Sequence, residues 1–205
     1  MKLDPVEMST LDVYRLMIRT IVPRPIAWIS SVSPDGVRNI APFSFFTGIT
    51  TDPPTVCFAP ARKSGAVKKD TLANVETTGE FVINVVSEEQ SEAMNDTATD
   101  YPPDVDEFER AGLTPVASEI VSPPRIGESP IHMECKLQTT VAVGNKGGIL
   151  VIGKVVMFHI DPRVVADGKV DAGLLKAVGR LGGQEYSRTT DRFVLERKKF
   201  RHDVT

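Results

Sequence analysis

Hydrophobic and polar positions alternate over short stretches of this chain, and period-two alternation is the pattern of β-strands. The longest example is 131–143, where apolar residues alternate with polar ones such as His132 and Glu134. This pattern predicts a strand with one buried face and with those two polar side chains on the face in water. A turn-forming Asn-Lys-Gly-Gly sequence follows at 145–148. The apolar stretch 149–160 is therefore expected to return antiparallel and complete a long hairpin.

Shorter strand patterns account for much of the remaining chain. They lie at 26–32, 37–40, 43–50, 55–59, 81–86 and 193–197, with a further candidate at 113–118. The turn formers Ser-Pro-Asp-Gly at 33–36 predict a hairpin between the first two. Asp-Pro-Pro at 52–54 predicts a second hairpin or a corner, because proline cannot donate a ladder hydrogen bond.

Helical patterns are short and lie between these strands. They are expected at 10–19, 70–77, 87–94, 106–111 and 172–177. Pro23 must end the first helix. Asp70 is the expected N-cap of the second helix, and Gly79 is its expected stop.

Strands joined mainly by hairpins, without regular βαβ alternation, predict a mainly β fold, namely an antiparallel β-barrel with peripheral α-helices. A β-sandwich is the alternative. With 205 residues, 41% of them hydrophobic, the chain is expected to form one domain over 1–205. The segment 97–130 is rich in Pro, Asp and Glu, and we expect it to be a surface excursion.

Composition and charge exclude several classes of protein. The chain has 24 Lys and Arg against 27 Asp and Glu, a net charge of −3, and no basic block of the kind that nucleic-acid binding needs. No stretch approaches the roughly 18 apolar residues of a membrane span, and the N-terminus lacks an apolar signal core. Cys57 and Cys135 form no CxxC motif. This cysteine usage suits a reducing compartment, and the cytoplasm is the expected location.

The motifs of common catalytic and metal sites are absent from the sequence. It contains no GxGxxG, GxxxxGK[ST], HExxH or GxSxG. His132 and Glu134 match part of a zinc deaminase motif, but the PCxxC that the motif requires is missing. We therefore expect no catalytic side chain and no metal site, and we interpret His159 as a structural histidine.

Polar and aromatic residues are interleaved between positions 39 and 47. The polar ones are Asn39, Ser44 and Thr47, and the aromatic ones are Phe43, Phe45 and Phe46. A flat heteroaromatic ligand needs this mixture, because apolar walls cover its faces while hydroxyl and amide groups pair with its polar edge. A core strand with a bulge at Pro42 explains the same residues equally well, so both interpretations stay open.

A basic loop leads into the helix expected at 70–77. Its cations are Arg62, Lys63, Lys68 and Lys69. Free N–H groups at a helix start favour an anion, so a phosphate fits here. An ordinary solvated loop is the alternative. Asp70 competes for the same amides, which makes Thr71 and the cations the better phosphate contacts.

Many sequence blocks occur in an order shared with a known family. They are RPIAWISSV, PDGVRNIAPFSFF, DPPTVCFAP, KKDTLANVETTGEFVINVV, PPDVDEFERAGLTP, SPIHMECKL and VGRLGGQEY, and they span nearly the whole chain. In these blocks the chain resembles the flavin reductase-like, FMN-binding split-barrel family, which includes flavoredoxins. The resemblance implies a six-stranded antiparallel split barrel, a homodimer, and one FMN per subunit near the dimer interface.

The resemblance also implies the residues of the FMN site. They are Trp28, Ile29, Ser30, Asn39, Ala41, Ser44, Phe45 and Phe46, then Arg62, Lys69, Asp70 and Thr71 around the phosphate, and Tyr186 near the ring or the partner subunit. Lys68 is the alternative to Lys69, because adjacent residues point in different directions.

The leading functional hypothesis is an FMN-dependent oxidoreductase that takes hydride from NADH or NADPH and passes electrons to an acceptor, which can be a protein. Because the flavin supplies this chemistry, missing catalytic motifs do not argue against an enzyme. The alternative is a flavoredoxin-type electron carrier without NAD(P)H activity. A third hypothesis is a split barrel that has lost its flavin or binds another planar cofactor, such as haem.

Overall fold

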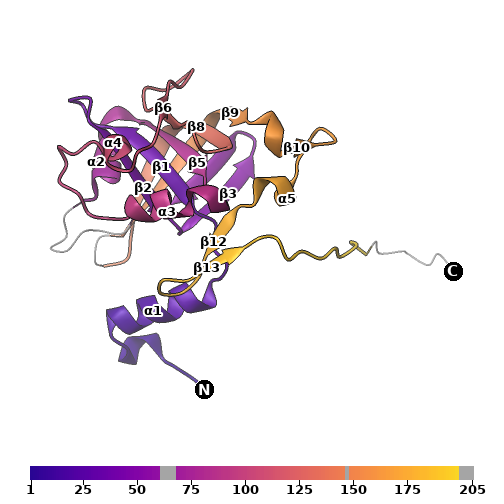
Figure 1. Ribbon diagram of the computed structural model, residues 1–205. Helices are drawn as coiled ribbons and strands as arrows, with labels where there is room; N and C mark the ends of the chain where they lie inside the picture. Colours follow the sequence, from indigo (N-terminus) through magenta and orange to yellow (C-terminus); the bar gives the residue numbers. More distant parts are fainter. Residues whose placement is uncertain (61–67, 146–147, 199–205) are drawn as a thin grey trace.

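The computed structural model describes residues 1–60, 68–145 and 148–198. Its largest feature is one antiparallel sheet with the strand order β2-β1-β5-β8-β9-β4-β3 (Figure 1). The strand bounds are Ala27–Val32 (β1), Arg38–Phe43 (β2), Phe46–Thr51 (β3), Pro54–Phe58 (β4), Glu80–Val85 (β5), Ile131–Val143 (β8) and Gly148–Ile160 (β9). The mainly antiparallel β class predicted from the sequence is confirmed.

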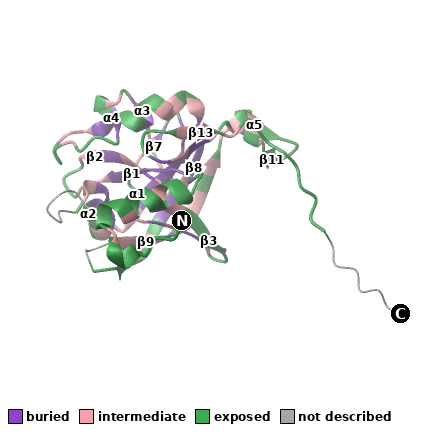
Figure 2. Ribbon diagram, turned by 90° about the horizontal axis from the view of Figure 1, so that it is seen from below, coloured by how far each residue is buried: buried purple, intermediate pink, exposed green. Residues whose placement is uncertain are grey.

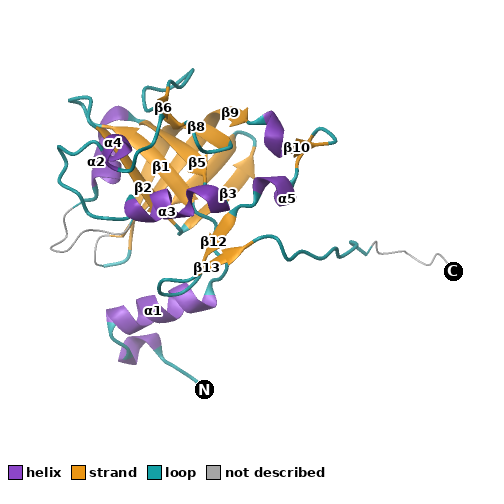
Figure 3. Ribbon diagram, in the orientation of Figure 1, coloured by secondary structure: helices purple, strands orange, loops and turns teal. Residues whose placement is uncertain are grey.

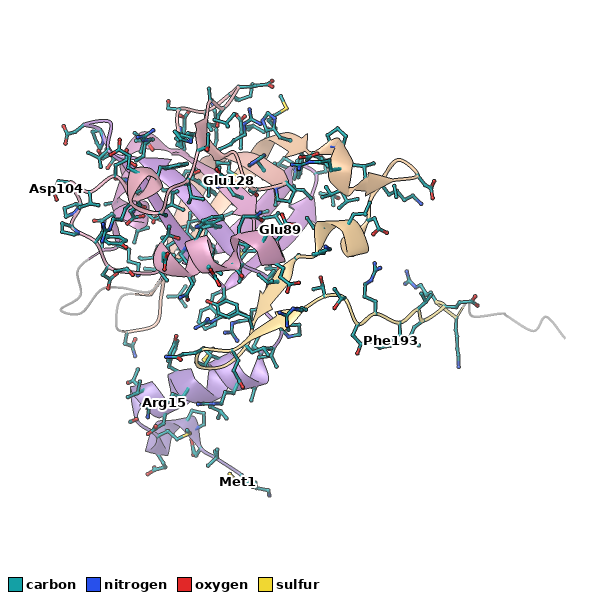
Figure 4. All side chains as sticks on the ribbon, viewed as in Figure 1. Met1, Arg15, Glu89, Asp104, Glu128 and Phe193 are labelled. Carbon is teal, nitrogen blue, oxygen red and sulfur yellow. The ribbon has the colours of Figure 1, made fainter. Side chains whose placement is uncertain are left out.

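The sheet has seven strands, which differs from the six implied by the resemblance. Seven of the strand patterns predicted between 26 and 160 correspond to these seven strands, while the candidate at 113–118 contains only a two-residue strand of a separate hairpin. β2 and β3 are the two ends of the hydrogen-bonded order, and no pairing between them occurs in the described part of the chain. The strand expected at 193–197 is wrong, because this segment runs away from the sheet with no neighbouring strand, as Phe193 shows in Figure 4.

Helices and short hairpins surround the sheet (Figure 3). The helices are α1 (Thr10–Thr20), α2 (Asp70–Thr78), α3 (Ser91–Asp96), α4 (Glu107–Arg110) and α5 (Ala172–Leu175), with single 3-10 turns at Pro5–Glu7, Glu88–Gln90 and Pro162–Val164. The short hairpins pair β6 (Pro115–Val116) with β7 (Arg125–Ile126), β10 (Val165–Ala166) with β11 (Lys169–Val170), and β12 (Val178–Arg180) with β13 (Tyr186–Arg188). Within the described residues, no helix is long and apolar enough to cross a membrane.

The helix ends follow ordinary capping chemistry, with one correction. Ser9 caps α1 by accepting a hydrogen bond of 3.1 Å from the amide of Asp12. Asp70 was expected to cap α2, but it is the first residue of that helix, and Lys69 is the N-cap without a side-chain hydrogen bond. Asp70 in the first turn still favours the helix through the macrodipole. Gly79 ends α2 as expected, at a positive φ of 72° that suits glycine.

Strand β1 is buried on both faces, and this divides the interior into two clusters. The inner core consists of Ala27, Ile29, Phe43, Val56, Phe58, Leu72, Val75, Phe81, Ile83, Cys135, Val151 and Val155. The outer core consists of Ile26, Trp28, Ile40, Val86, Met94, Phe108, Leu113, Ile126 and Val178. Because successive side chains of a strand point to opposite faces, Ile29 joins the inner core and Trp28 the outer one.

The segment 97–130 is more than the surface excursion expected from its composition. Phe108 and Ile126 are fully buried in the outer core. Thr97 accepts a hydrogen bond of 2.8 Å from the indole nitrogen of Trp28, and Asn84 of β5 accepts one of 2.9 Å from the amide of Ile126. The segment therefore covers the outer face of the central strands.

Two polar residues of β8 were expected in water, and the structure buries both. His132 is 8% exposed and Glu134 has no exposed surface. Glu134 accepts hydrogen bonds of 2.8, 2.7 and 3.1 Å from the consecutive amides of residues 119–121 and lies 2.6 Å from Nε2 of His159. The covering segment thus replaces water with backbone donors, which the alternation within β8 cannot reveal.

The opposite deviation occurs at the far end of the same strand. Val141 and Val143 were expected on the buried face but are 42% and 55% exposed. β8 pairs with β5 only as far as Lys136, and beyond that point it is paired with β9 alone. None of the segments that the structure describes therefore covers the end of the hairpin as β5 covers its beginning.

Glu134 should make the free energy of unfolding depend on pH. Burial raises the pKa of Glu134, but the hydrogen bonds from Glu119, His159 and the next two amides outweigh burial and leave this pKa below its usual range. A lowered folded-state pKa stabilises the protein above the unfolded pKa of about 4.3 and loses this contribution as pH falls through the folded value. Glu134→Gln should therefore cost about 2 kcal/mol of unfolding free energy at pH 7.

Urea unfolding of the Glu134→Gln variant at pH 7 and below pH 4 checks this prediction. The difference from the wild type should shrink in acid, because the wild-type carboxylate becomes protonated. Glu128→Gln is the control, since Glu128 also accepts from a backbone amide, that of Thr114, but is exposed. An equal cost in the two variants, or a difference independent of pH, would contradict the role given to Glu134.

Candidate functional site

Three adjoining hollows follow β2, and we call them together the β2 groove. The polar hollow is bordered by Asn39 and Ala41, and the middle hollow by Pro42, Ser44 and Phe45. Lys69 borders both of these. The third hollow shares Pro42 and Ser44 with the middle one and ends at Arg180 and Tyr186. The volumes are about 20, 160 and 210 Å³ in this order.

Helix α1 forms one wall of the groove, although it stands apart from the sheet in Figure 1. Seen from below, it crosses in front of the sheet (Figure 2). Its Tyr14 borders both the middle and the third hollow, and Ile18 borders the middle one. The groove therefore lies between β2, the first helix and the β12–β13 hairpin.

A buried chain of hydrogen bonds fixes the polar hollow. The Thr71 hydroxyl donates to Oδ1 of Asn39 at 2.7 Å, and the Ser31 hydroxyl donates to the same oxygen at 3.3 Å. Asn74 donates in turn to Ser31 at 3.2 Å. Both donors to Asn39 hold its oxygen inward, and among the described residues no acceptor bonds its Nδ2. The Asn39 amide can therefore offer N–H groups to a molecule in the groove.

The charges around the polar hollow are mixed. Lys69 borders it and lies 3.1 Å from Asp100, while the carboxylates of Asp70 and Glu107 line it as well. Glu107 accepts from the amide of Ile40 at 2.6 Å. The first amides of α2 have no side-chain cap, which favours an anion. The volume of about 20 Å³ holds one water-sized group, so this hollow as it stands can take only the end of an anionic group.

The aromatic run after Pro42 divides between the groove and the inner core. Phe43 is buried, with its ring centroid 5.3 Å from that of Phe58. Phe46 packs against the inner core and borders none of the three hollows. Phe45 lines the middle hollow, where the guanidinium of Arg24 lies 6.0 Å from its ring centroid. Phe43 and Phe46 thus belong to the inner core and Phe45 to the wall of the groove, and β2 pairs with β1 through Pro42 without the bulge that the core interpretation expected.

Arg24 organises the centre of the groove, and its part in the site was not predicted from the sequence. It is 4% exposed. Its Nη1 donates to the carbonyls of Ile18 and Ile21 at 2.6 and 2.7 Å, its Nη2 to that of Leu181 at 2.8 Å, and its Nε to the Ser44 hydroxyl at 3.2 Å. Ser44 thus accepts from Arg24, and its own O–H, with no acceptor in the described part of the chain, can donate into the groove.

The structure does not bring Trp28, Ile29 or Ser30 to the groove. All three have no exposed surface and border none of the hollows. Trp28 and Ile29 belong to the outer and inner cores, and Ser30 donates to the carbonyl of Pro124. These three residues lie on β1, which pairs with β2 and so supports the strand that borders the groove. Arg62 lies outside the described residues.

Tyr186 stands at the end of the groove farthest from α2. Its hydroxyl donates to Oδ1 of Asn95 at 3.1 Å, and the guanidinium of Arg180 lies 4.3 Å from its ring centroid. Asn39, Ala41, Ser44, Phe45, Lys69, Asp70, Thr71 and Tyr186 are the sequence-predicted site residues that border or support the groove. Tyr14 and Arg180 were not identified as site residues from the sequence. Tyr14 lies in a helix with apolar positions and Arg180 in a Gly-rich block, and neither pattern points to a binding site.

Metal ligands are not gathered in the described residues. No group of three or more His, Cys, Asp or Glu side chains lies close enough there to hold a metal ion. His159 pairs with Glu134. The groove therefore combines hydrogen-bond donors, cations and aromatic walls with carboxylates at its polar end.

Comparison with known proteins supplies a family for this arrangement. The model of the flavin reductase-like domain matches residues 18–174. The chain belongs to the flavin reductase-like family. The match contains the whole sheet, α2 and most of the groove, while β12 and β13 lie beyond it.

Solved structures of this family have the same fold. Nitrilotriacetate monooxygenase component B from Bacillus cereus is 37% identical, with 95% of this chain and 98% of that chain covered and a TM-score of 0.91. Pseudomonas fluorescens 2-nitrobenzoate 2-nitroreductase is 30% identical, with full coverage of both chains and a TM-score of 0.88. Flavoredoxin of Desulfovibrio vulgaris, at 21% identity, covers 96% of this chain and 97% of its own with a TM-score of 0.75, and shows the shared fold.

Proposed function

We propose that this flavin reductase-like protein binds FMN in the β2 groove and transfers hydride from NADH or NADPH to it, passing the electrons onward. The observation that carries this proposal is the order in which different chemical groups follow one another along the groove. A helix start with Lys69 lies at one end, aromatic and hydroxyl groups lie at the middle, and an open hollow lies beyond them. This order matches a nucleotide with a phosphate and a planar ring.

The residues present fit FMN in their donor chemistry. The first amides of α2 and Lys69 suit the phosphate, and the Nδ2 group of Asn39 suits a neighbouring acceptor. Ser44 can donate to the polar edge of a ring that Phe45 covers. When bound, the flavin supplies the hydride and electron chemistry. The chain binds and orients it and leaves one side of the groove open.

A visible spectrum of the purified protein, followed by steady-state oxidation of NADH and NADPH, tests this function. Bands near about 370 and 450 nm with release of FMN should be seen, and NAD(P)H should be consumed with added flavin. Bound FMN without NAD(P)H turnover would instead favour a flavoredoxin-type electron carrier that receives its electrons from a protein partner. A colourless protein that binds no added FMN would reject both.

Lys69 and Lys68 offer a matched pair of substitutions at the phosphate end. Lys69 borders the groove, whereas Lys68 pairs with Glu76 away from it. Lys69→Ala should weaken FMN binding by about 1–2 kcal/mol, because Lys69 exchanges its contact with Asp100 for a charge-assisted bond to the phosphate. Fluorescence titration of both variants measures this difference. Weaker binding in Lys68→Ala than in Lys69→Ala would reverse the assignment.

We also propose that the protein is a homodimer in which a second copy covers α1. This helix has 11 residues and none of them is buried. Its exposed apolar side chains are Leu11, Tyr14, Leu16 and Met17, followed by Ile21 and Val22 beyond its end. An isolated helix of this length is marginal in water, so it needs a packing partner.

The two cysteines are free, which supports the proposal of a cytoplasmic location.

Light scattering of the wild type and of Met17→Glu checks the dimer. The wild type should have the mass of two chains at micromolar concentration, and the charge placed in the apolar face should shift the variant toward one chain. Arg15→Gln is the control on the same helix, because Arg15 is exposed and pairs only with Asp12. A wild-type monomer, or an equal shift in the control, would reject α1 as the interface.

A further inference from the structure

Two arginines lie opposite one another on paired segments, Arg24 at the centre of the β2 groove and Arg180 in its third hollow. Arg24 and Arg180 form an isolated antiparallel bridge, with backbone hydrogen bonds of 3.0 Å from Arg24 to Arg180 and 2.8 Å in the reverse direction. No carboxylate pairs with either side chain in the part of the chain that the structure describes. Like charges directly opposite on paired strands are destabilising. The pair therefore lacks an anion that would balance it.

The two guanidinium groups are used differently. Arg24 gives four of its five N–H donors to three carbonyls and to Ser44, so little of its donor capacity is left for a ligand. Arg180 gives one donor to the carbonyl of Gly183 and lies over the ring of Tyr186. Since a guanidinium has five N–H donors, Arg180 keeps most of its donors for a molecule in the third hollow.

The third hollow is positive and partly aromatic. It is lined by Tyr14, Ile26, Pro42, Ser44, Met94, Asn95, Ala98, Arg180 and Tyr186, with no acidic side chain. Burial lowers the pKa of Arg24, the nearby Tyr14 raises it, and the charge of Arg180 lowers it further. The polar hollow at the other end contrasts with this, because three carboxylates border it. The Arg180 end therefore suits an anion without a competing carboxylate among its lining residues.

We propose that the third hollow is a binding site for a single-ring aromatic carboxylate, held through its carboxylate by Arg180. The planar fork of a guanidinium matches a carboxylate in two parallel hydrogen bonds. Tyr14, Met94 and Tyr186 offer the ring its apolar contacts. A volume of about 210 Å³ is below the range of sites for drug-sized molecules and suits one ring with its acid group.

This site deepens the proposed function, since the hollow shares Pro42 and Ser44 with the middle of the groove. An aromatic acid bound there lies next to the place proposed for the flavin ring. Arg180 then determines which small molecules reach that ring. It selects an aromatic acid over a neutral molecule of the same shape.

Calorimetric titration with benzoate and with benzamide, its neutral counterpart, tests the site in the full chain with and without added FMN. Benzoate should bind the wild type, and benzamide should bind about tenfold or more weakly. Arg180→Gln should weaken benzoate binding about tenfold or more and leave benzamide unchanged, and Arg180→Lys should restore part of the loss. Arg188→Gln is the matched control, because Arg188 lies on the same hairpin and pairs with Glu88.

Equal binding of benzoate and benzamide, or equal loss of both in Arg180→Gln, would overturn the proposal. So would an Arg180→Gln variant with unchanged benzoate binding and a raised KM for NADH or NADPH, which would assign Arg180 to a phosphate of the nicotinamide nucleotide. Calorimetry needs no flavin chemistry. A protein that binds no added FMN but still binds benzoate through Arg180 would therefore reject the proposed function and keep this site.

Discussion

The buried guanidinium of Arg24 is the contact on which the shape of the groove depends. It joins the end of α1, the segment after β12 and the Ser44 hydroxyl, which are far apart in the sequence. A buried charge without a carboxylate is costly unless it is hydrogen-bonded, and Arg24 makes one hydrogen bond to Ser44 and three to carbonyl oxygens. Two of these belong to the C-terminal end of α1, where a positive charge also suits the helix dipole.

The two ends of the groove differ in their charged groups. Lys69, the start of α2 and several carboxylates lie at one end, while Arg180, without a carboxylate partner among the described residues, lies at the other. The hydrogen bonds from Thr71 and Ser31 fix Asn39 near the first end. A long ligand with chemically different ends can therefore bind in one orientation only. Selectivity for orientation is what the proposed hydride transfer to FMN would require of the protein.

The sequence predicted elements well where the determinants are local. β8 has the bounds expected from its alternation, and the turn at 33–36 does join β1 to β2. The buried state of Glu134 could not be predicted, because its donors at 119–121 come from another part of the chain. The packing of segment 97–130 could not be predicted for the same reason. The segment is mostly polar, but a few of its large apolar residues complete the outer core.

The candidate site divides along similar lines. Residues next to the expected helix start and after Pro42 do meet in one groove, because α2 packs beside β2. Trp28 and its neighbours lie in the adjacent strand, and a strand covered on both faces offers no surface to a ligand. Arg180 needed the tertiary structure, since its position opposite Arg24 comes from a bridge between distant segments.

Helix α1 belongs both to the wall of the groove and to the surface proposed for the dimer contact. Tyr14 and Ile18 form part of the wall, yet no residue of their helix is buried in one chain. Arg24 secures only the C-terminal end of this helix. A second copy that covers the apolar face of α1 would therefore order Tyr14 as well. Binding in the groove and association of two chains must then favour one another, because each stabilises the same position of the helix.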